Sequence, residues 1–250
     1  DKCNQDYLKV LKINKFYTFY NNYTFSENSE GRITVEHKPS VEGLFDIKRS
    51  GGDLSVNVSA IVGQNGSGKS SLLELYYLCM YFIAINREKP FLEPNLLSIS
   101  AKLSKLDSSK PNYTYDKTKL NNQRKEIEKI IDELKVQLFY SVDEAIYLYD
   151  TSREKIDNLE YDFVDLIEGS KNEKRKFLMS SLFDDSSPYD PTGFAYSCVV
   201  NYSIFGLNSI EMGDWITTLF HKNDAYRTPI VINPMRTNGD FNIDEENELL

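Results

Sequence analysis

The sequence predicts an α/β fold, and three observations carry this prediction. An alternating apolar segment at residues 54–62 has the pattern of a strand that enters a buried sheet. A glycine-rich loop at residues 63–68 follows it directly, and a helix-favouring stretch runs from residue 69 to about residue 86. Short strand-like segments in the first fifty residues indicate an antiparallel β layer ahead of this strand, loop and helix.

The N-terminal β layer is predicted from composition and alternation. Residues 7–25 mix aliphatic side chains with a dense set of aromatic ones, which is typical of strands and turns. Residues 32–37 and 44–48 are two further strand candidates. The sequence Ser-Gly-Gly-Asp at residues 50–53 predicts the turn that leads into the next strand.

The chain beyond the predicted helix is less regular. Residues 98–112 are polar and predict a loop. Residues 117–138 predict a charged amphipathic helix, whose apolar positions are too few for a coiled coil. Residues 136–142 and 145–149 flank an Asp-Glu pair and predict a β-hairpin.

The C-terminal part returns to regular patterns. Residues 184–193 predict a loop, and the alternation over residues 194–204 predicts a strand. A short helix is expected at residues 211–221 and a strand at residues 229–233.

The composition is that of an ordinary globular protein. Of the 250 residues 40% are hydrophobic and 27% are charged, which excludes wholesale disorder. Three cysteines and two histidines without a CxxC pair argue against a disulfide framework and a structural zinc site, and they suit a cytoplasmic protein. The longest apolar run, residues 75–85, is too short to cross a membrane. The net charge of −9 gives no support to nucleic-acid binding by the chain as a whole, although a local basic face stays open.

One segment carries a specific chemical signal. It matches the phosphate-binding pattern GxxxxGK[ST] with Gly63, Gln64, Asn65, Gly66, Ser67, Gly68, Lys69 and Ser70. Such glycines let the backbone curl until its N–H groups surround an anion, and the following helix directs its positive dipole end at the same phosphates. Lys69, the catalytic candidate, is expected to reach the β- and γ-phosphates, Ser70 to bind Mg²⁺, and Ser71 to contact phosphate. The sequence therefore predicts a nucleotide site, and the alternative is a glycine-rich turn without a ligand.

The amino-acid sequence around this segment resembles that of a known family. Residues 60–74, AIVGQNGSGKSSLLE, resemble the Walker A motif of ABC-type ATPases, in particular of their SMC-like and OLD-like branch. Residues 196–209, YSCVVNYSIFGLNS, and residues 228–236, TPIVINPMR, followed by acidic residues 244–246, resemble the ATPase subunit of Septu-type and retron-associated antiphage systems. The narrower resemblance covers about residues 60–86 and 194–246.

The resemblance implies a fold and a function. It implies an ABC-type nucleotide-binding head lobe formed by residues 1–86 and 193–250, with a helical and hairpin insertion at residues 87–192. It also implies binding of ATP with Mg²⁺, ATP-dependent pairing with a second copy of the ATPase, and hydrolysis in the complete protein. The expected partners are an HNH-type nuclease and a retron reverse transcriptase or nucleic acid, and no membrane.

The sequence also departs from the family pattern, because no LSGGQ-like signature follows the loop. Residues 50–53 resemble part of that signature but precede the loop, so a hairpin turn is the better interpretation. Residues 145–150, AIYLYD, resemble a Walker B strand, yet Thr151 follows where the catalytic Glu should stand, which favours a hairpin strand. Gln123 and Gln137 cannot be assigned to a Q-loop. We therefore expect the N-terminal part of a longer protein that is by itself incomplete for hydrolysis.

Other residues are weaker candidates. In the family an aromatic residue on an early strand stacks on adenine, which singles out Tyr17, Phe19 and Tyr20, although a core or surface position is the simpler interpretation. Arg236 faces a phosphate or a partner in one interpretation and is a surface residue in the other. His221 near a predicted helix C-terminus is explained by the helix dipole.

Two other functions stay open. The first is an SMC-like ATPase that clamps DNA during repair, which a basic stripe would favour and the acidic balance disfavours. The second is an ATP-binding sensor or scaffold with little turnover. Release of γ-phosphate by the complete protein distinguishes such a sensor from an enzyme.

Overall fold

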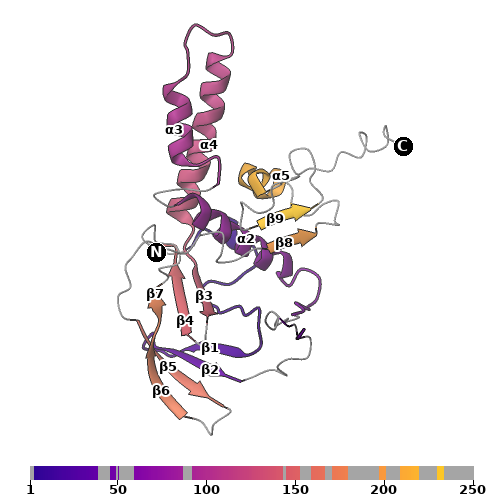
Figure 1. Cartoon of the computed structure of the whole chain (residues 1–250), viewed down its shortest axis with the longest axis vertical. Coiled ribbons are helices and arrows are strands. Elements are labelled where there is room, and N and C mark those ends of the chain that lie inside the picture. Colours follow the sequence, from indigo (N-terminus) through magenta and orange to yellow (C-terminus); the bar gives the residue numbers. More distant parts are fainter. Residues whose placement is uncertain are drawn as a thin grey trace, which may run out of the picture. The chain divides into compact units, whose positions relative to one another are not determined.

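The computed structural model has mixed α and β structure and divides into two compact units. It describes residues 3–38, 46–48, 50, 59–86, 92–142, 145–152, 159–166, 171–179, 197–200, 209–219 and 230–233. The first unit comprises Asp1–Tyr7, Leu73–Val136 and Ser180–Leu250. The second comprises Leu8–Leu72 and Gln137–Met179. Figure 1 shows the elements of both units coloured along the sequence.

The second unit contains a four-stranded and a three-stranded sheet. The four-stranded sheet has the order β1-β2-β5-β6, with bounds Tyr23–Glu27, Ile33–His37, Glu160–Asp165 and Lys171–Lys176. Strand β2 is antiparallel to β1 and parallel to β5, and β5 is antiparallel to β6. The three-stranded sheet has the order β3-β4-β7, with bounds Gln137–Val142, Ala145–Asp150 and Leu178–Met179. Strand β4 pairs antiparallel with β3 and parallel with β7.

The two sheets share one hydrophobic core. Alternate residues of three strands point into it, since successive side chains of a strand face opposite sides. Its buried members are Ile33, Val35, Ile146, Leu148, Tyr161, Phe163 and Phe177. Aromatic contacts extend the core, for example between the rings of Phe139 and Phe177, whose centroids lie 5.2 Å apart. The dense aromatic content of the sequence therefore serves packing in this unit.

Helix α2 (Lys69–Ile85) continues from the second unit into the first. Its residues from 77 to 85 are all buried. The prediction of a buried helix after the glycine loop is confirmed. None of the helices in the described part of the chain combines the length and hydropathy that a membrane span requires.

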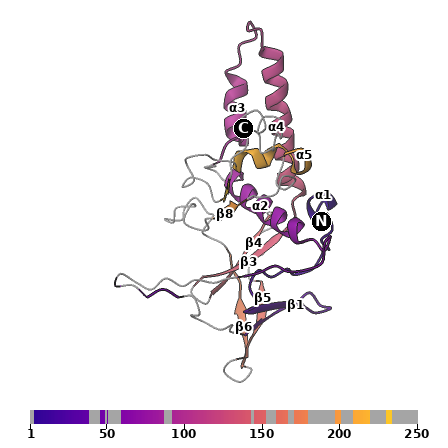
Figure 2. The same cartoon turned by 90° about the vertical axis from the view of Figure 1, so that its right-hand side faces the viewer.

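The rest of the first unit contains a helical hairpin and smaller elements. The hairpin consists of α3 (Leu96–Ser104) and α4 (Tyr113–Glu133). Figures 1 and 2 show the two helices side by side, with the turn between them at the end away from α2. The unit also contains α1 (Gln5–Leu8, of which Leu8 belongs to the second unit), α5 (Ser209–Met212) and the 3-10 helix η3 (Asp214–Leu219). Strands β8 (Ser197–Val200) and β9 (Ile230–Asn233) pair in parallel.

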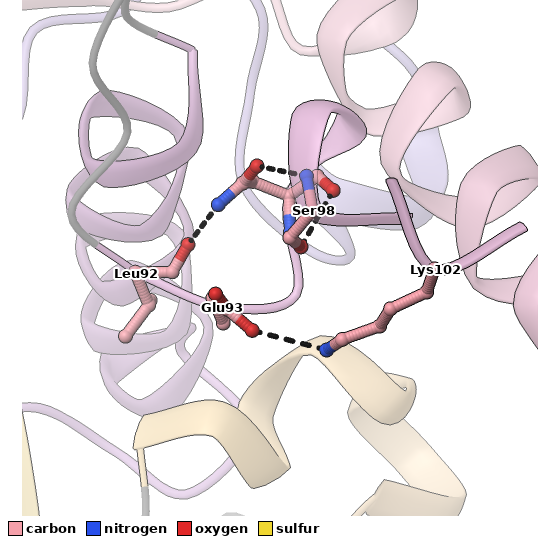
Figure 3. Close-up of polar contacts among 5 residues, drawn as sticks. Leu92, Glu93, Ser98 and Lys102 are labelled. Atoms are coloured by element: carbon pink, nitrogen blue, oxygen red, sulfur yellow. Dashed lines mark hydrogen bonds and ion pairs between the residues drawn. The ribbon is translucent and has the colours of Figure 1, made fainter. Parts of the chain in front are cut away.

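The start of α3 is fixed by a capping box. The Asn95 side chain accepts a hydrogen bond from Ser98 N–H at 2.9 Å, and Asn95 N–H donates to Ser98 Oγ at 3.0 Å. The Asn95 amide also donates to the Leu92 carbonyl at 2.9 Å. Figure 3 shows these bonds beside an ion pair in which Lys102 Nζ lies 3.0 Å from Glu93 Oε2. The cap satisfies backbone donors that the first turn of a helix leaves free.

Helix α4 holds η3 through one partly buried carboxylate. The Glu126 carboxylate accepts a hydrogen bond from Trp215 N–H at 3.4 Å, while Trp215 Nε1–H donates to the Met212 carbonyl at 2.5 Å. The Trp215 ring packs against Tyr81 of α2, with centroids 5.5 Å apart. Burial raises the pKa of Glu126, and the negative charge of Asp214 raises it further.

Several predicted elements differ from the observed ones. The loop predicted at residues 98–112 is wrong over its first part, because α3 continues to Ser104. The helix predicted at residues 117–138 begins earlier and ends at Glu133, where the chain turns into β3. The helix predicted at residues 211–221 is split by Gly213, whose φ of +99° is incompatible with a right-handed helix.

The predicted β layer is present in part. Strands β1 and β2 form the expected antiparallel pair. Residues 7–22 contain the end of α1 and no strand, so the strand prediction for residues 7–25 is wrong except at its end. At residues 44–48 only residues 46–48 are described, with a single β-bridge at Ile47. Residues 51–53 and 184–193 lie outside the described part of the chain.

The boundaries of the two compact units differ from those of the predicted insertion at residues 87–192. Of residues 87–192, those up to Val136 belong to the first unit, as do those from Ser180 on, whereas Gln137–Met179 belongs to the second. The insertion boundaries of 87 and 192 therefore stay a prediction about domain organisation.

Candidate nucleotide-binding loop

The glycine-rich motif is a curled loop that leads into α2. Residues 63–68 belong to no helix or strand, and the helix begins at Lys69. Ser67 N–H donates to the Gln64 carbonyl at 3.2 Å, which closes the turn. Leu72 N–H donates to the Gly68 carbonyl at 2.9 Å as the first helical hydrogen bond. The predicted order of loop and helix is confirmed.

Two glycines of the loop adopt backbone conformations that other residues rarely take. Gly66 has a φ of +78° and Gly68 a φ of +94°. A Cβ on Gly66 would meet no heavy atom within 4 Å, so the backbone is open on this side. A Cβ on Gly68 would lie 3.1 Å from Val10 Cγ2 and 3.2 Å from Leu11 Cδ2. The loop thus packs closely against residues 10–11 on one side and leaves its backbone accessible at Gly66.

The ammonium group of Lys69 lies over the loop that precedes it. Its Nζ donates to the Gly63 carbonyl at 2.8 Å and to the Gln64 carbonyl at 2.9 Å. A lysine ammonium has three donors, so one stays available for a further acceptor. Lys69 forms no ion pair with any carboxylate in the described part of the chain, and the first turn of α2 contains no acidic residue. Positive charge is therefore concentrated where the loop meets the helix.

The two serines after Lys69 differ in exposure. Ser70 is exposed, whereas Ser71 is only 9% exposed. A ligand that approaches from solvent reaches the Ser70 hydroxyl more readily than that of Ser71. The described residues include no group of three or more His, Cys, Asp or Glu side chains suited to a metal ion.

The segment before the loop differs from the prediction. Residues 59–62 belong to no strand, and Val62 is 86% exposed, so the expected buried strand is absent at Ala60–Val62. Residues 54–58 lie outside the described part of the chain. The apolar, β-branched composition favours a strand, but a strand forms only where a neighbour accepts and donates its backbone hydrogen bonds. No described strand pairs with residues 59–62.

One aromatic candidate is linked to the surroundings of the loop. The Tyr17 hydroxyl accepts a hydrogen bond from Lys12 N–H at 2.9 Å, and Lys12 follows the Leu11 that approaches Gly68. The Lys15 ammonium lies 5.3 Å from the centroid of the Tyr17 ring. Residues 10–11, whose contact with the loop no sequence motif indicates, therefore connect the segment around Tyr17 to the loop. Phe19 is half-buried and Tyr20 is exposed.

The strand that resembled a Walker B motif is a hairpin strand, as predicted. Strand β4 pairs antiparallel with β3 in the register Gln137↔Asp150. The Asp150 carboxylate accepts hydrogen bonds from Gln137 Nε2 at 2.8 Å and from Ser152 N–H at 2.7 Å. Gln137 is thus occupied by Asp150, and Gln123 lies on α4. His221, Arg236 and residues 244–246 lie outside the described part of the chain.

The chain was compared with models of protein families, with curated proteins and with solved structures, and none of them matches it. What the protein does is therefore inferred from the chemistry of its own residues, foremost those of the loop.

Proposed function

We propose that the protein binds ATP together with Mg²⁺ at residues 63–71. The observation that carries this proposal is the position of Lys69. Its ammonium lies against the Gly63 and Gln64 carbonyls, at the N-terminus of a 17-residue helix, with no described carboxylate to neutralise it. A positive charge, a helix N-terminus and a curled glycine loop each favour an anion, and here all three coincide.

The residues of the loop fit a bound triphosphate. The open backbone at Gly66 admits phosphate oxygens close to the main chain, where N–H groups of the loop and of the first turn of α2 can donate. Lys69 retains one donor for the β- or γ-phosphate. The exposed Ser70 hydroxyl is the ligand for Mg²⁺, which neutralises charge on the phosphates when it is bound.

The larger role is proposed from the resemblance of residues 60–86 and 194–246. The protein would be the ATPase subunit of a cytoplasmic antiphage defence complex. ATP would promote pairing with a second copy of the ATPase, and the nucleotide state would control an HNH-type nuclease. A retron reverse transcriptase or nucleic acid would be a further partner.

A second candidate function is an ATP-dependent sensor with little turnover. Transfer of phosphate to water needs a group that positions the water, commonly a carboxylate. Asp150 is engaged in the β3–β4 hairpin and is followed by the nearly fully buried Thr151. The Asp-Glu pair at residues 143–144 follows β3 in the sequence, and β3 pairs antiparallel with β4. These placements favour binding without hydrolysis by residues 1–250.

Calorimetry and a phosphate-release assay on the 250-residue chain test both candidates. We expect saturable, Mg²⁺-dependent binding of ATP and essentially no steady-state release of phosphate. Absence of ATP binding would refute the proposal. Robust phosphate release would instead refute the sensor function, and Glu144→Gln would then show whether the pair at residues 143–144 supplies the missing carboxylate.

A further inference from the structure

The helical hairpin of α3 and α4 carries charge of the opposite sign to that of the whole chain. Residues 96–125 contain seven basic and two acidic side chains, a balance of +5, whereas the chain has a net charge of −9. The residues outside this segment therefore have a net charge of −14. Residues 126–133, at the other end of α4, contain four acidic side chains and one basic. The excess of basic charge therefore lies in the part of the hairpin nearest its turn, residues 102–125, which we call the basic tip.

The basic side chains of the tip all face solvent. They are Lys102, Lys105, Lys110, Lys117, Lys119, Arg124 and Lys125. Two of the seven are in ion pairs: Lys102 with Glu93 (Figure 3), and Arg124 with Glu128 at 2.8 Å. The other five form no ion pair with a described residue, and Lys117 donates only to the Tyr113 hydroxyl at 3.3 Å. Most of the positive charge is therefore available to a partner.

Helix stability does not explain these lysines. The N-terminal end of a helix favours acidic side chains, yet Lys110 precedes α4 and Lys117 and Lys119 lie in its second turn. Lys125 stands four residues before Lys129, whose like charge repels it, and three residues before Glu128, which already pairs with Arg124. None of these basic side chains packs in a hydrophobic core either, since all of them are exposed. Their placement is instead what a site for an extended anion requires.

The dimensions and the neighbouring side chains favour a nucleic acid. From Tyr113 to Lys125 the helix rises about 18 Å, which matches about five nucleotide steps along the axis of a duplex at 3.4 Å each. Tyr115 is 69% exposed and offers a ring on which an unpaired base can stack. Exposed Asn122 supplies donors and acceptors for sugar or phosphate oxygens. Figures 1 and 2 show the turn of the hairpin at the end away from α2, where a strand has access to both helices.

We propose that the basic tip, residues 102–125, binds the phosphodiester backbone of a nucleic acid. The lysines supply affinity without sequence preference, because phosphates are the same in every sequence. The acidic remainder of the chain repels the same strand and so restricts contact to the tip. This proposal does not depend on ATP binding, because none of its residues belongs to the glycine loop.

Two charge-matched variants of the chain test the proposal. The tip variant replaces three of its unpaired lysines: Lys105→Gln, Lys110→Gln and Lys119→Gln. The control variant replaces three exposed lysines of the second unit: Lys38→Gln, Lys48→Gln and Lys174→Gln. Both change the net charge equally, and thermal unfolding verifies that both stay folded. Fluorescence anisotropy then measures binding of labelled single-stranded DNA, single-stranded RNA and duplex DNA of equal length.

The expected result is a loss confined to the tip variant. Each lost contact with a single strand lowers the slope of log K against log salt by about 0.7, so three contacts remove about 2 from the slope. At 0.1 M salt this corresponds to roughly 100-fold weaker binding, whereas the control changes by about twofold or less. Lys69→Met should bind nucleic acid like the unchanged chain, which separates this proposal from that of the ATP site.

Three results would overturn the proposal. The first is no binding of any of the nucleic acids by the unchanged chain at about 50 mM salt, where backbone contacts are strong. The second is an equal loss in the tip and control variants, which would place the contact outside the hairpin. The third is displacement of nucleic acid by poly-glutamate of matched charge at equal concentration, which would indicate an acidic protein partner instead.

Discussion

Replacement of Lys69 by Met tests the loop most directly. Methionine keeps an unbranched apolar side chain that matches the stem of lysine, with sulfur in place of Cδ, and lacks the ammonium. Two of the three ammonium donors are used by the Gly63 and Gln64 carbonyls, which leaves one for a phosphate oxygen. A hydrogen bond to a charged group contributes about 1.5–3 kcal/mol. Since about 1.4 kcal/mol corresponds to a factor of ten, Lys69→Met should weaken ATP binding about 10- to 150-fold.

Calorimetry with ATP and with AMP, both with Mg²⁺, measures this loss. AMP lacks the two phosphates that the motif assigns to Lys69, so its affinity should change by about twofold or less. The lost bonds to the carbonyls lie in an exposed loop, so the free energy of unfolding should fall by about 1 kcal/mol or less. Unchanged affinity for ATP in the folded variant, or an equal loss for AMP, would refute the role given to Lys69.

Three further predictions concern the site and its surroundings. Ser70→Ala should weaken ATP binding about tenfold or more with Mg²⁺ and little in chelator; equal losses in calorimetry would contradict Ser70 as the metal ligand. Gly66→Ala should lower the free energy of unfolding by about 1–2 kcal/mol, because alanine is strained at a positive φ. Gly68→Ala should lower it further, because the added Cβ would also lie 3.1 and 3.2 Å from two side chains. Urea unfolding measures both losses, and a larger loss for Gly66→Ala would contradict the observed packing. Burial raises the pKa of the Glu126 carboxyl in the folded state. Above this raised pKa, ionised Glu126 lowers the free energy of unfolding. Below the pKa that Glu126 has in the unfolded chain, the carboxyl is neutral in both states and this loss disappears. Glu126→Gln, which can still accept from Trp215 N–H, should therefore raise the melting temperature at pH 7, with the gain shrinking as the pH falls toward about 4.5; a constant gain would point to another cause.

The glycine loop and the helix after it follow from the sequence alone, because the signals for both are local. The loop needs residues that tolerate positive φ, and Gly66 and Gly68 occupy these positions. Helix α2 needs a long run of apolar residues with no interior glycine or proline. The hairpin of β3 and β4 is equally local, since the two strands are joined by two residues.

Helix α3 and the basic tip both have sequence signals that are easily overlooked. The segment that forms α3 contains three serines, and its polar character predicts a loop over most of its length. Its apolar residues Leu96, Ile99 and Leu103 nevertheless follow a helical period, and Asn95 with Ser98 has the spacing of a capping box. The charge of the basic tip is likewise readable from the sequence, but the total of −9 hides it.

The tertiary structure alone decides which distant segments meet. Strand β2 pairs in parallel with β5, in the register Ile33↔Tyr161, across more than a hundred residues that no local pattern bridges. It also decides that Gly68 packs on Val10 and Leu11. The opposite case is Ala60–Val62, whose composition favours a strand but which has no described neighbour to pair with. Turns and helices satisfy their hydrogen bonds within a few residues and are encoded locally, whereas strands depend on partners that only the folded chain supplies.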